Sequence, residues 1–284
     1  MLDGDRGHLV ARRANYKKDN LEAPEIIYNP DLKEYYLFVS YDPLMTTYNV
    51  RVGRSDKAEG PFIDYFGKEL KDTTNNFPIL TAPYRFKNHS GWAGTAHCAV
   101  FTSDDGQYFM AHQGRLSPQN QMMDLHVRQV FFTKDGWPVV SPERYAGSNP
   151  REFSAADLVG EWEIIRVQEP LYERKLEAGQ ILWGEGELQD EEWNMSHLLY
   201  LEKDGKLGED QGTWDFAKED QSLQLTLNGE VVRNLIVFAG HDWENETETV
   251  LFTGLDSRGR SVWGKRTKSV SYTHLRAHET LMNL

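Results

Sequence analysis

The sequence contains little cysteine, no long apolar run and fewer basic than acidic residues. Its 284 residues include one cysteine, Cys98, which excludes an internal disulfide. No apolar segment approaches the roughly 20 residues of a membrane-spanning helix, so we expect no membrane partner. The formal charge of −13 would repel phosphates, so we expect no nucleic-acid partner. The first residues, MLDGDRGHLVARR, lack the apolar core of a signal peptide and read like the interior of a longer protein.

Several catalytic signatures are also missing. The sequence has no G-x-S-x-G elbow, no H-E-x-x-H, no P-loop and no G-x-G-x-x-G. Cys98 directly follows His97 in the apolar run GTAHCAVF. Successive residues of a strand point to opposite faces, so a Cys-His catalytic pair is not expected there.

Aromatic residues are abundant, and the stretch LEAPEIIYNPDLKEYYLFVSY at 21–41 organises the chain. β-branched and aromatic residues fill 25–28 and 35–40, and an Asn-Pro-Asp turn separates them, which predicts a β-hairpin. Glu22 stands just before Ala23-Pro24 at the start of this hairpin. A carboxyl held there is a candidate general acid, and a solvated loop glutamate is the alternative.

A second unit follows the first at a constant offset. Pro24 and His97, and likewise Tyr28 and Phe101, lie 73 residues apart, and both units close on a turn rich in Gly and Pro. Such repetition of four-stranded units is typical of a β-propeller, so we expect two of its blades. We also expect a strand over residues 7–14.

The sequence pattern changes near residues 146–153, where Gly, Ser, Asn and Pro cluster. Beyond it we expect about eight short strands, one of them at 180–183, and no long helix, which favours a small antiparallel barrel. Residues 268–284 continue neither pattern. The predicted organisation is therefore a propeller part over 1–146, a barrel over 154–267, and a non-native or disordered tail over 268–284.

The run EAPEIIY…YYLFVSY…YNVRVGRS…GPF resembles glycoside hydrolase family 43, and most closely its bacterial endo-1,5-α-L-arabinanases. The segment after 153 resembles the lipocalin-like C-terminal domain of some of these enzymes. The resemblance implies an all-β fold with the last two blades of a five-bladed β-propeller followed by a small antiparallel β-barrel. It also implies inverting hydrolysis of internal α-1,5 links in arabinan.

The resemblance makes Glu22 the general acid, because it matches the glutamate of the family's E-A-P motif. An inverting glycosidase also needs a carboxylate base about 6.5–9.5 Å away. The family's base and its acid-tuning aspartate come from earlier blades, and no aspartate of this sequence matches them. We therefore expect an N-terminally truncated chain that is inactive alone.

The resemblance further places His97 at the propeller centre, beside a calcium ion with a mostly water shell. A buried histidine bonded to the backbone is the alternative. Trp92 and Tyr48 are candidates for stacking on arabinose rings. Asn49 is a candidate for contacting substrate or orienting Glu22.

The expected parent protein is an extracellular, monomeric enzyme acting on arabinan. A non-catalytic carbohydrate-binding or interaction protein built on the barrel is the second hypothesis, because barrel mouths hold ligands readily. Another family 43 specificity, such as arabinofuranosidase or xylosidase activity, is the third.

Overall fold

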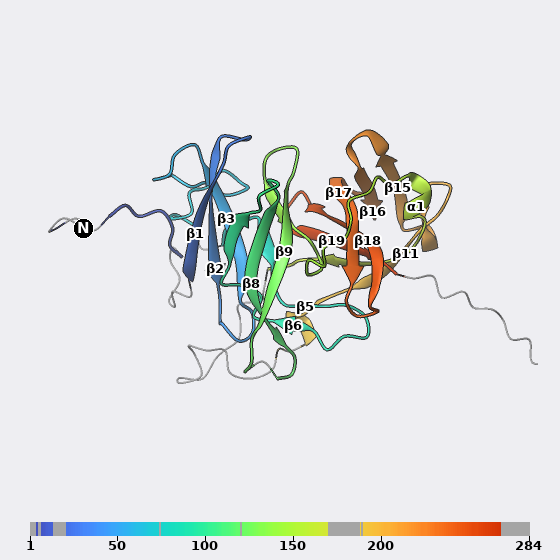
Figure 1. The fold of residues 1–284 in the computed structure, drawn as a ribbon, viewed down its shortest axis with the longest axis horizontal. Coiled ribbons are helices and arrows are strands. Elements are labelled where there is room, and N and C mark those ends of the chain that lie inside the picture. The colour runs from blue at the N-terminus through green and yellow to red at the C-terminus, as the bar shows by residue number, and fades with distance from the viewer. Residues whose placement is uncertain are drawn as a thin grey trace, which may run out of the picture.

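The chain folds into two β-blades and a β-barrel that lie side by side (Figure 1). The computed structural model describes residues 4, 7–13, 21–73, 75–119, 121–169, 188 and 190–267. Helical structure within them is confined to α1 (Ala155–Leu158) and the 3-10 turns η1 (Asp190–Glu192), η2 (Gly208–Asp210) and η3 (Lys218–Asp220). In these ranges no helix has the length and apolar character needed to cross a membrane.

The first blade is a four-stranded antiparallel sheet in sequence order. Its strands are β1 (Leu21–Asn29), β2 (Glu34–Tyr41), β3 (Asn49–Ser55) and β4 (Ile79–Thr81). The predicted turn joins β1 to β2, and Asn29 Oδ1 accepts hydrogen bonds from the backbone N–H groups of Asp31 and Leu32, at 3.0 and 3.1 Å. The predicted hairpin is confirmed.

The second blade repeats this plan. Its strands are β7 (Ala99–Thr102), β8 (Tyr108–Leu116), β9 (Asp124–Phe132) and β10 (Pro138–Val140). Strand β8 also pairs with β6 (Trp92–Ala93), which pairs with β5 (Tyr84–Arg85). Strand β12 (Asn194–Met195) then joins β5 in parallel and brings this sheet to seven strands. A strand from beyond residues 146–153 therefore completes a sheet of the blades.

Residues 7–13 form no strand, so the predicted strand over 7–14 is wrong in its described part. The segment instead packs Val10 and Ala11 against the outer face of the first blade, beside Leu37 and Val39. Its apolar residues cover a sheet rather than joining one.

The rest of the described chain closes into an eight-stranded antiparallel barrel. Its strands are β11 (Gly160–Arg166), β13 (His197–Leu201), β14 (Lys206–Leu207), β15 (Gly212–Ala217), β16 (Ser222–Leu227), β17 (Glu230–Asp242), β18 (Thr247–Leu255) and β19 (Ser261–Arg266). Asn228 and Gly229 join β16 to β17, both with positive φ, as a tight hairpin turn requires. The prediction of two propeller blades followed by a small antiparallel barrel is confirmed. The strand expected at 180–183 and the tail at 268–284 lie outside the described residues.

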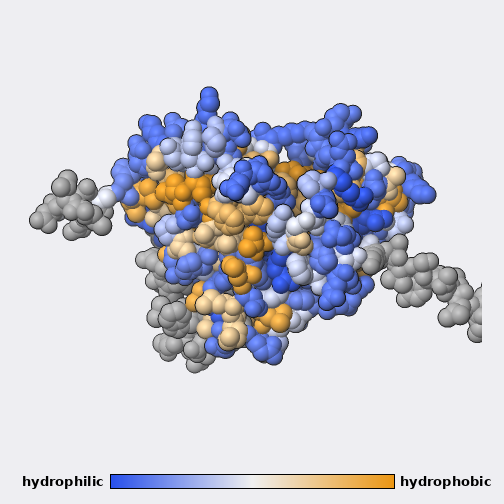
Figure 2. All heavy atoms as spheres, in the orientation of Figure 1, coloured by the Kyte–Doolittle hydropathy of each residue, from blue (hydrophilic) through white to orange (hydrophobic). Residues whose placement is uncertain are grey.

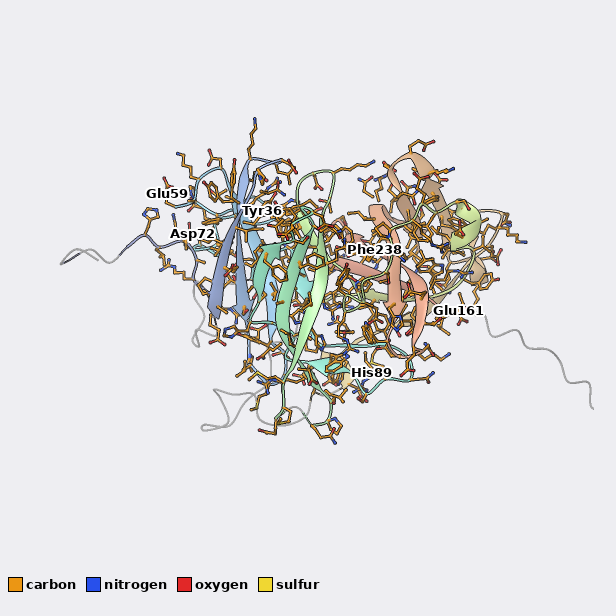
Figure 3. All side chains as sticks on the ribbon, viewed as in Figure 1. Tyr36, Glu59, Asp72, His89, Glu161 and Phe238 are labelled. Carbon is orange, nitrogen blue, oxygen red and sulfur yellow. The ribbon has the colours of Figure 1, made fainter. Side chains whose placement is uncertain are left out.

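Side chains of β11 and β19 alternate between the inside of the barrel and the core of the blades. Trp162 and Val262 point into the barrel, whereas Ile165 and Trp263 of the same two strands join the core of the blades. Phe238 of β17 also meets Phe131 of β9, with ring centroids 4.5 Å apart, where barrel and second blade adjoin (Figure 3). The two parts share one apolar interior.

Apolar side chains also gather on the surface of the blades (Figure 2). Ile26 and Tyr28 of β1 and Phe101 of β7 are about half exposed, and Leu125 of β9 is 75% exposed. Apolar groups gathered in this way commonly mark a contact surface.

Candidate active site

Glu22 stands at a distorted start of β1. It pairs with Ser40 of β2, and the register then shifts before Glu25, with Ala23 at φ 49°. A non-glycine residue in this left-handed region is strained, and such strain gathers at functional positions. The bulge lets the exposed Glu22 reach inward, where its Oε1 accepts a hydrogen bond of 2.6 Å from the hydroxyl of Tyr48.

Tyr48 is fully buried and belongs to the core of the blades. Burial raises the pKa of Tyr48 above its ordinary value, and the hydrogen bond to Glu22 adds to the effect. The phenol therefore stays protonated and donates to the carboxylate. Its burial gives no support to stacking on a sugar ring, which remains an untested prediction.

His97 meets the first blade at the same place. It also has a positive φ, 57°, and its backbone N–H donates to Ser40 Oγ at 2.9 Å. Ser40 is thus opposite Glu22 in the hairpin and bonded to the start of the second blade. The structure brings Glu22, Tyr48 and His97 to one end of the two blades. Sequence reasoning missed Ser40, because the register of the hairpin turn continues to Tyr41 opposite Glu22, and the shift between Glu22 and Glu25 puts Ser40 there instead.

A cavity of about 600 Å³ opens beside these residues. The starts of β1 and β7 and the facing parts of β8 and β9 line it, including Glu25, His97, His112 and Asp124. His97 is exposed. The cavity has room for part of a sugar chain, and its lining contains both carboxylates and imidazoles.

Asn49 lies beneath this end of the first blade in a buried polar network. Its amide nitrogen donates to Asp42 Oδ2 at 2.6 Å, and its oxygen accepts from Nε of Arg51 at 2.9 Å. Asp42 also pairs with Arg13 at 2.6 Å. Burial raises the pKa of Asp42, against the opposing charges of the two arginines. Asn49 is fully buried, so the structure places it where it supports β3, and substrate contact stays untested.

Trp92 lies elsewhere, in β6, and is 5% exposed. His89 stacks on it with ring centroids 5.5 Å apart, and the ring of His126 is 4.4 Å away. Both neighbours are protein rings, so this packing lends no support to sugar stacking by Trp92. That role remains an untested prediction.

The described residues do not build a calcium site around His97. Calcium takes six to eight oxygen ligands, and an imidazole supplies only a nitrogen. The described chain brings three candidate metal ligands close together elsewhere, at Glu143, Asp242 and Glu244 where barrel and blades meet.

Lys265 already occupies the centre of that acidic cluster. Its Nζ lies 2.8 Å from Glu143 and 3.0 Å from Asp242, bonds to Glu244, and lies 3.9 Å above the ring of Phe86. Burial raises the pKa of Glu143 to about 8, with Lys265 opposing and Glu244 adding to the rise. Burial opposes charge on Glu244 too, but Lys265 and a hydrogen bond with Glu143 lower the pKa of Glu244 to about 2. The ammonium thus takes the place of a metal ion, and we interpret the cluster as a structural ion-pair network.

The comparisons with known proteins agree with this architecture. The model of glycosyl hydrolases family 43 matches residues 3–138, and that of the C-terminal lipocalin-like domain of the same family matches residues 142–264. The extracellular endo-alpha-(1->5)-L-arabinanase 2 of Bacillus subtilis is 26% identical over 268 residues. The extracellular endo-alpha-(1->5)-L-arabinanase of Thermotoga petrophila is 26% identical over 267 residues. Each alignment covers 87% of this chain and 53% of the relative, so the chain spans about half the length of these proteins.

Solved structures share the fold. The crystal structure of the endo-1,5-alpha-L-arabinanase from Thermotoga petrophila matches with a TM-score of 0.72 at 23% identity, over 88% of this chain and 56% of that one. A glycoside hydrolase family 43 protein from Bacillus licheniformis matches with a TM-score of 0.71 at 24% identity, over 87% and 56% of the two chains. The blades, the barrel and both family matches lead to one assignment: the chain belongs to glycoside hydrolase family 43 and includes that family's lipocalin-like C-terminal domain.

Proposed function

We propose that this chain contributes the acid-bearing part of an enzyme that hydrolyses internal α-1,5 links of arabinan with inversion. The convergence of Glu22, Tyr48 and His97 beside an open cavity carries the proposal. The relatives named as endo-arabinanases support the substrate class.

Glu22 acts as the general acid. Its exposed carboxyl protonates the glycosidic oxygen as the bond to the anomeric carbon breaks, so the leaving chain departs as a neutral alcohol. Tyr48 fixes the carboxyl by donating to one of its oxygens, which leaves the other free for the substrate. Inversion needs a second carboxylate that activates water, and we assign none in this chain, so we expect the chain alone to be inactive on arabinan.

Calcium near His97 stays part of the proposal. His97 would lie beside the ion at the cavity wall, and a mostly water shell would supply the oxygen ligands that calcium takes. The bound cation would supply positive charge beside the reacting carboxyls.

Secretion is supported by the word extracellular in both relatives' names, and a monomeric state is our expectation. We propose the division into 1–146, 154–267 and a separate tail at 268–284, supported by the ranges of the two family models.

The acid role is testable in a chimera in which this chain replaces the matching half of the Bacillus subtilis relative. Glu22→Gln should lower hydrolysis of arabinan roughly 10²–10⁴-fold, because the leaving oxygen loses its proton donor. The loss should shrink on an aryl arabinofuranoside whose leaving group needs no proton. Glu34→Gln, at the other end of the same hairpin, is the matched control and should keep full activity. Equal activity of the Glu22→Gln and parent chimeras on arabinan would refute the assignment.

A further inference from the structure

The barrel has an open end that forms a second cavity, of about 520 Å³. Strands β11 and β16 end there, and β13, β15 and β17 begin there. Residues Trp193 to Met195, which include β12, close the side that faces the blades. This volume lies within the range of about 300–1,000 Å³ that small-molecule sites occupy.

The floor and one wall of this cavity are apolar and fixed in place. Ile164 and Leu199 are 6% and 5% exposed and form the floor, whereas Leu198 of the wall is 43% exposed. The indole of Trp193 is held by the guanidinium of Arg85, 4.4 Å from the ring centroid. Gly91 lies so close that a Cβ there would stand 2.6 Å from the indole. The wall is therefore preorganised, which lowers the cost of binding.

The rim is polar but balanced in charge. Arg166 and Glu230 pair with each other at 2.6 Å, and amides supplied by Gln168, Gln211 and Asn228 surround them. Such a rim offers planar donors and acceptors without a net charge. It suits a neutral ligand that has hydroxyls on one side and an apolar face on the other.

The barrel interior argues against a lipid. An acyl chain needs a deep lumen, but the lumen is filled by buried side chains such as Trp162 and Phe252, whose rings lie 5.1 Å apart. Among the described residues of the barrel, the open space lies at the mouth. A shallow amphipathic cavity with paired hydrogen-bonding groups matches a saccharide better than an acyl chain.

We propose that the open end of the barrel is a binding site for a neutral saccharide, separate from the cavity at the blades. The Arg166–Glu230 pair and the neighbouring amides bind the hydroxyls, and the floor and Leu198 contact the apolar face of the sugar. This site does not depend on hydrolysis.

Calorimetric titration of the whole chain with linear α-1,5 arabino-oligosaccharides tests the proposal. Xylo-oligosaccharides serve as a second saccharide and laurate as the lipid probe. Two variants alter the cavity: Leu198→Arg fills it, and the double variant Arg166→Gln with Glu230→Gln removes the charged pair. The pair is partly exposed, so its loss should spare the fold. Each variant should weaken saccharide binding roughly tenfold or more. Leu198→Arg removes the space for the sugar ring, and the double variant removes hydrogen bonds to charged groups.

The matched control is another exposed ion pair, at the opposite end of the barrel. Asp204 of the turn after β13 pairs with Lys206 of β14 at 3.4 Å. The double variant Asp204→Asn with Lys206→Gln should bind as the parent does. The readout is the difference in binding between the parent and the barrel-cavity variants, not hydrolysis, so failure of the acid assignment leaves this result intact. Absence of saccharide binding, tighter binding of laurate, or equal binding by the parent and both cavity variants would overturn the proposal.

Discussion

Lys265 shows how one residue can hold two structural units together. It extends from the barrel strand β19, yet it pairs with Glu143 from the connection that follows the blades and packs against Phe86 of the blades. The side chain of Lys265 is fully buried, and that of Asp242 is 1% exposed. A buried charge is tolerated only while it is paired, so the group is sensitive to the loss of any member.

Lys265→Met should therefore destabilise the protein by about 3–5 kcal/mol, because the carboxylates around it lose their counter-ion. The free energy of unfolding from urea titration measures this. Lys206→Met, at an exposed position of the same barrel, should change it by no more than about 0.5 kcal/mol. Equal effects of the two substitutions would contradict the role given to Lys265.

The same cluster predicts a dependence on pH. Burial raises the pKa of Glu143 from 4.5 to about 8, so the folded state keeps a proton that the unfolded state releases. The stability that this proton contributes is present below about 4.5 and is lost as pH rises toward about 8. Glu143→Gln removes the titrating group, so its stability relative to the parent should rise with pH across that window.

Urea midpoints of both proteins, taken at a series of pH values, provide the measurement. Glu230→Gln is the control, because the hydrogen bond from Arg166 lowers the pKa of Glu230 and its titration falls below this window. A constant difference in stability between Glu143→Gln and the parent would rule out the proposed titration.

At the residue scale, the sequence identified positions better than roles. Glu22 was placed at the start of its blade by its position before Ala23-Pro24, and His97 by its 73-residue offset from Pro24, and the structure has both there. Tyr48 was a candidate for stacking on a sugar, which stays a prediction, and the structure adds that it is buried and donates to Glu22. An aromatic side chain near a strand end can serve either purpose, and only the packing of the two blades decides between them.

At the scale of elements, glycine decides how closely β15 and β16 approach. Gly212 has φ 143°, and a Cβ there would lie 1.8 Å from the carbonyl oxygen of Thr226. No side chain fits in that gap, so the pairing depends on this glycine.

Gly212→Ala should consequently cost more stability than Gly229→Ala. Both positions have positive φ, but a Cβ at Gly229 would meet nothing within 4 Å. Backbone strain should cost each variant roughly 1–2 kcal/mol, and the collision should add about 1–3 kcal/mol at Gly212 alone. Thermal unfolding of both variants, compared with the parent, gives the difference. Indistinguishable melting temperatures would show that β15 can move away from β16 at little cost.

The elements that the sequence predicted are those with a local signal. The hairpin of β1 and β2 and the Asn228-Gly229 turn follow from neighbouring residues. Strands β5, β6 and β12 were not predicted, because each has two residues and shows no periodicity. The pairing of β12 with β5 also joins segments about a hundred residues apart, which no local pattern reveals.

At the scale of the whole molecule, the blades and the barrel share one apolar core. Trp263 of the barrel lies edge-on to Tyr84 of the blades at 5.4 Å, and Ser261 and Thr253 of the barrel donate to backbone carbonyls of β4 and β10. Either part alone would expose this shared core to water.

We therefore expect the two parts to unfold together. Hydrogen exchange followed by mass spectrometry in increasing urea should give the same midpoint for peptides from β2 and from β17. Ser261→Ala, which removes one bond across the boundary, should lower both midpoints equally. Protection that persists in β17 after β2 has become fully exchanged would show that the barrel is an independent domain.

The parallel pairing of β12 with β5 has a further consequence for the polypeptide between the two parts. A protease that nicks the backbone within residues 146–153 severs the covalent link, but the strand exchanged across the boundary keeps its hydrogen bonds to the blades. The two fragments should then migrate together under native conditions and separate only in detergent or denaturant. A clean cut at this junction is therefore no sign that the lobes were ever autonomous.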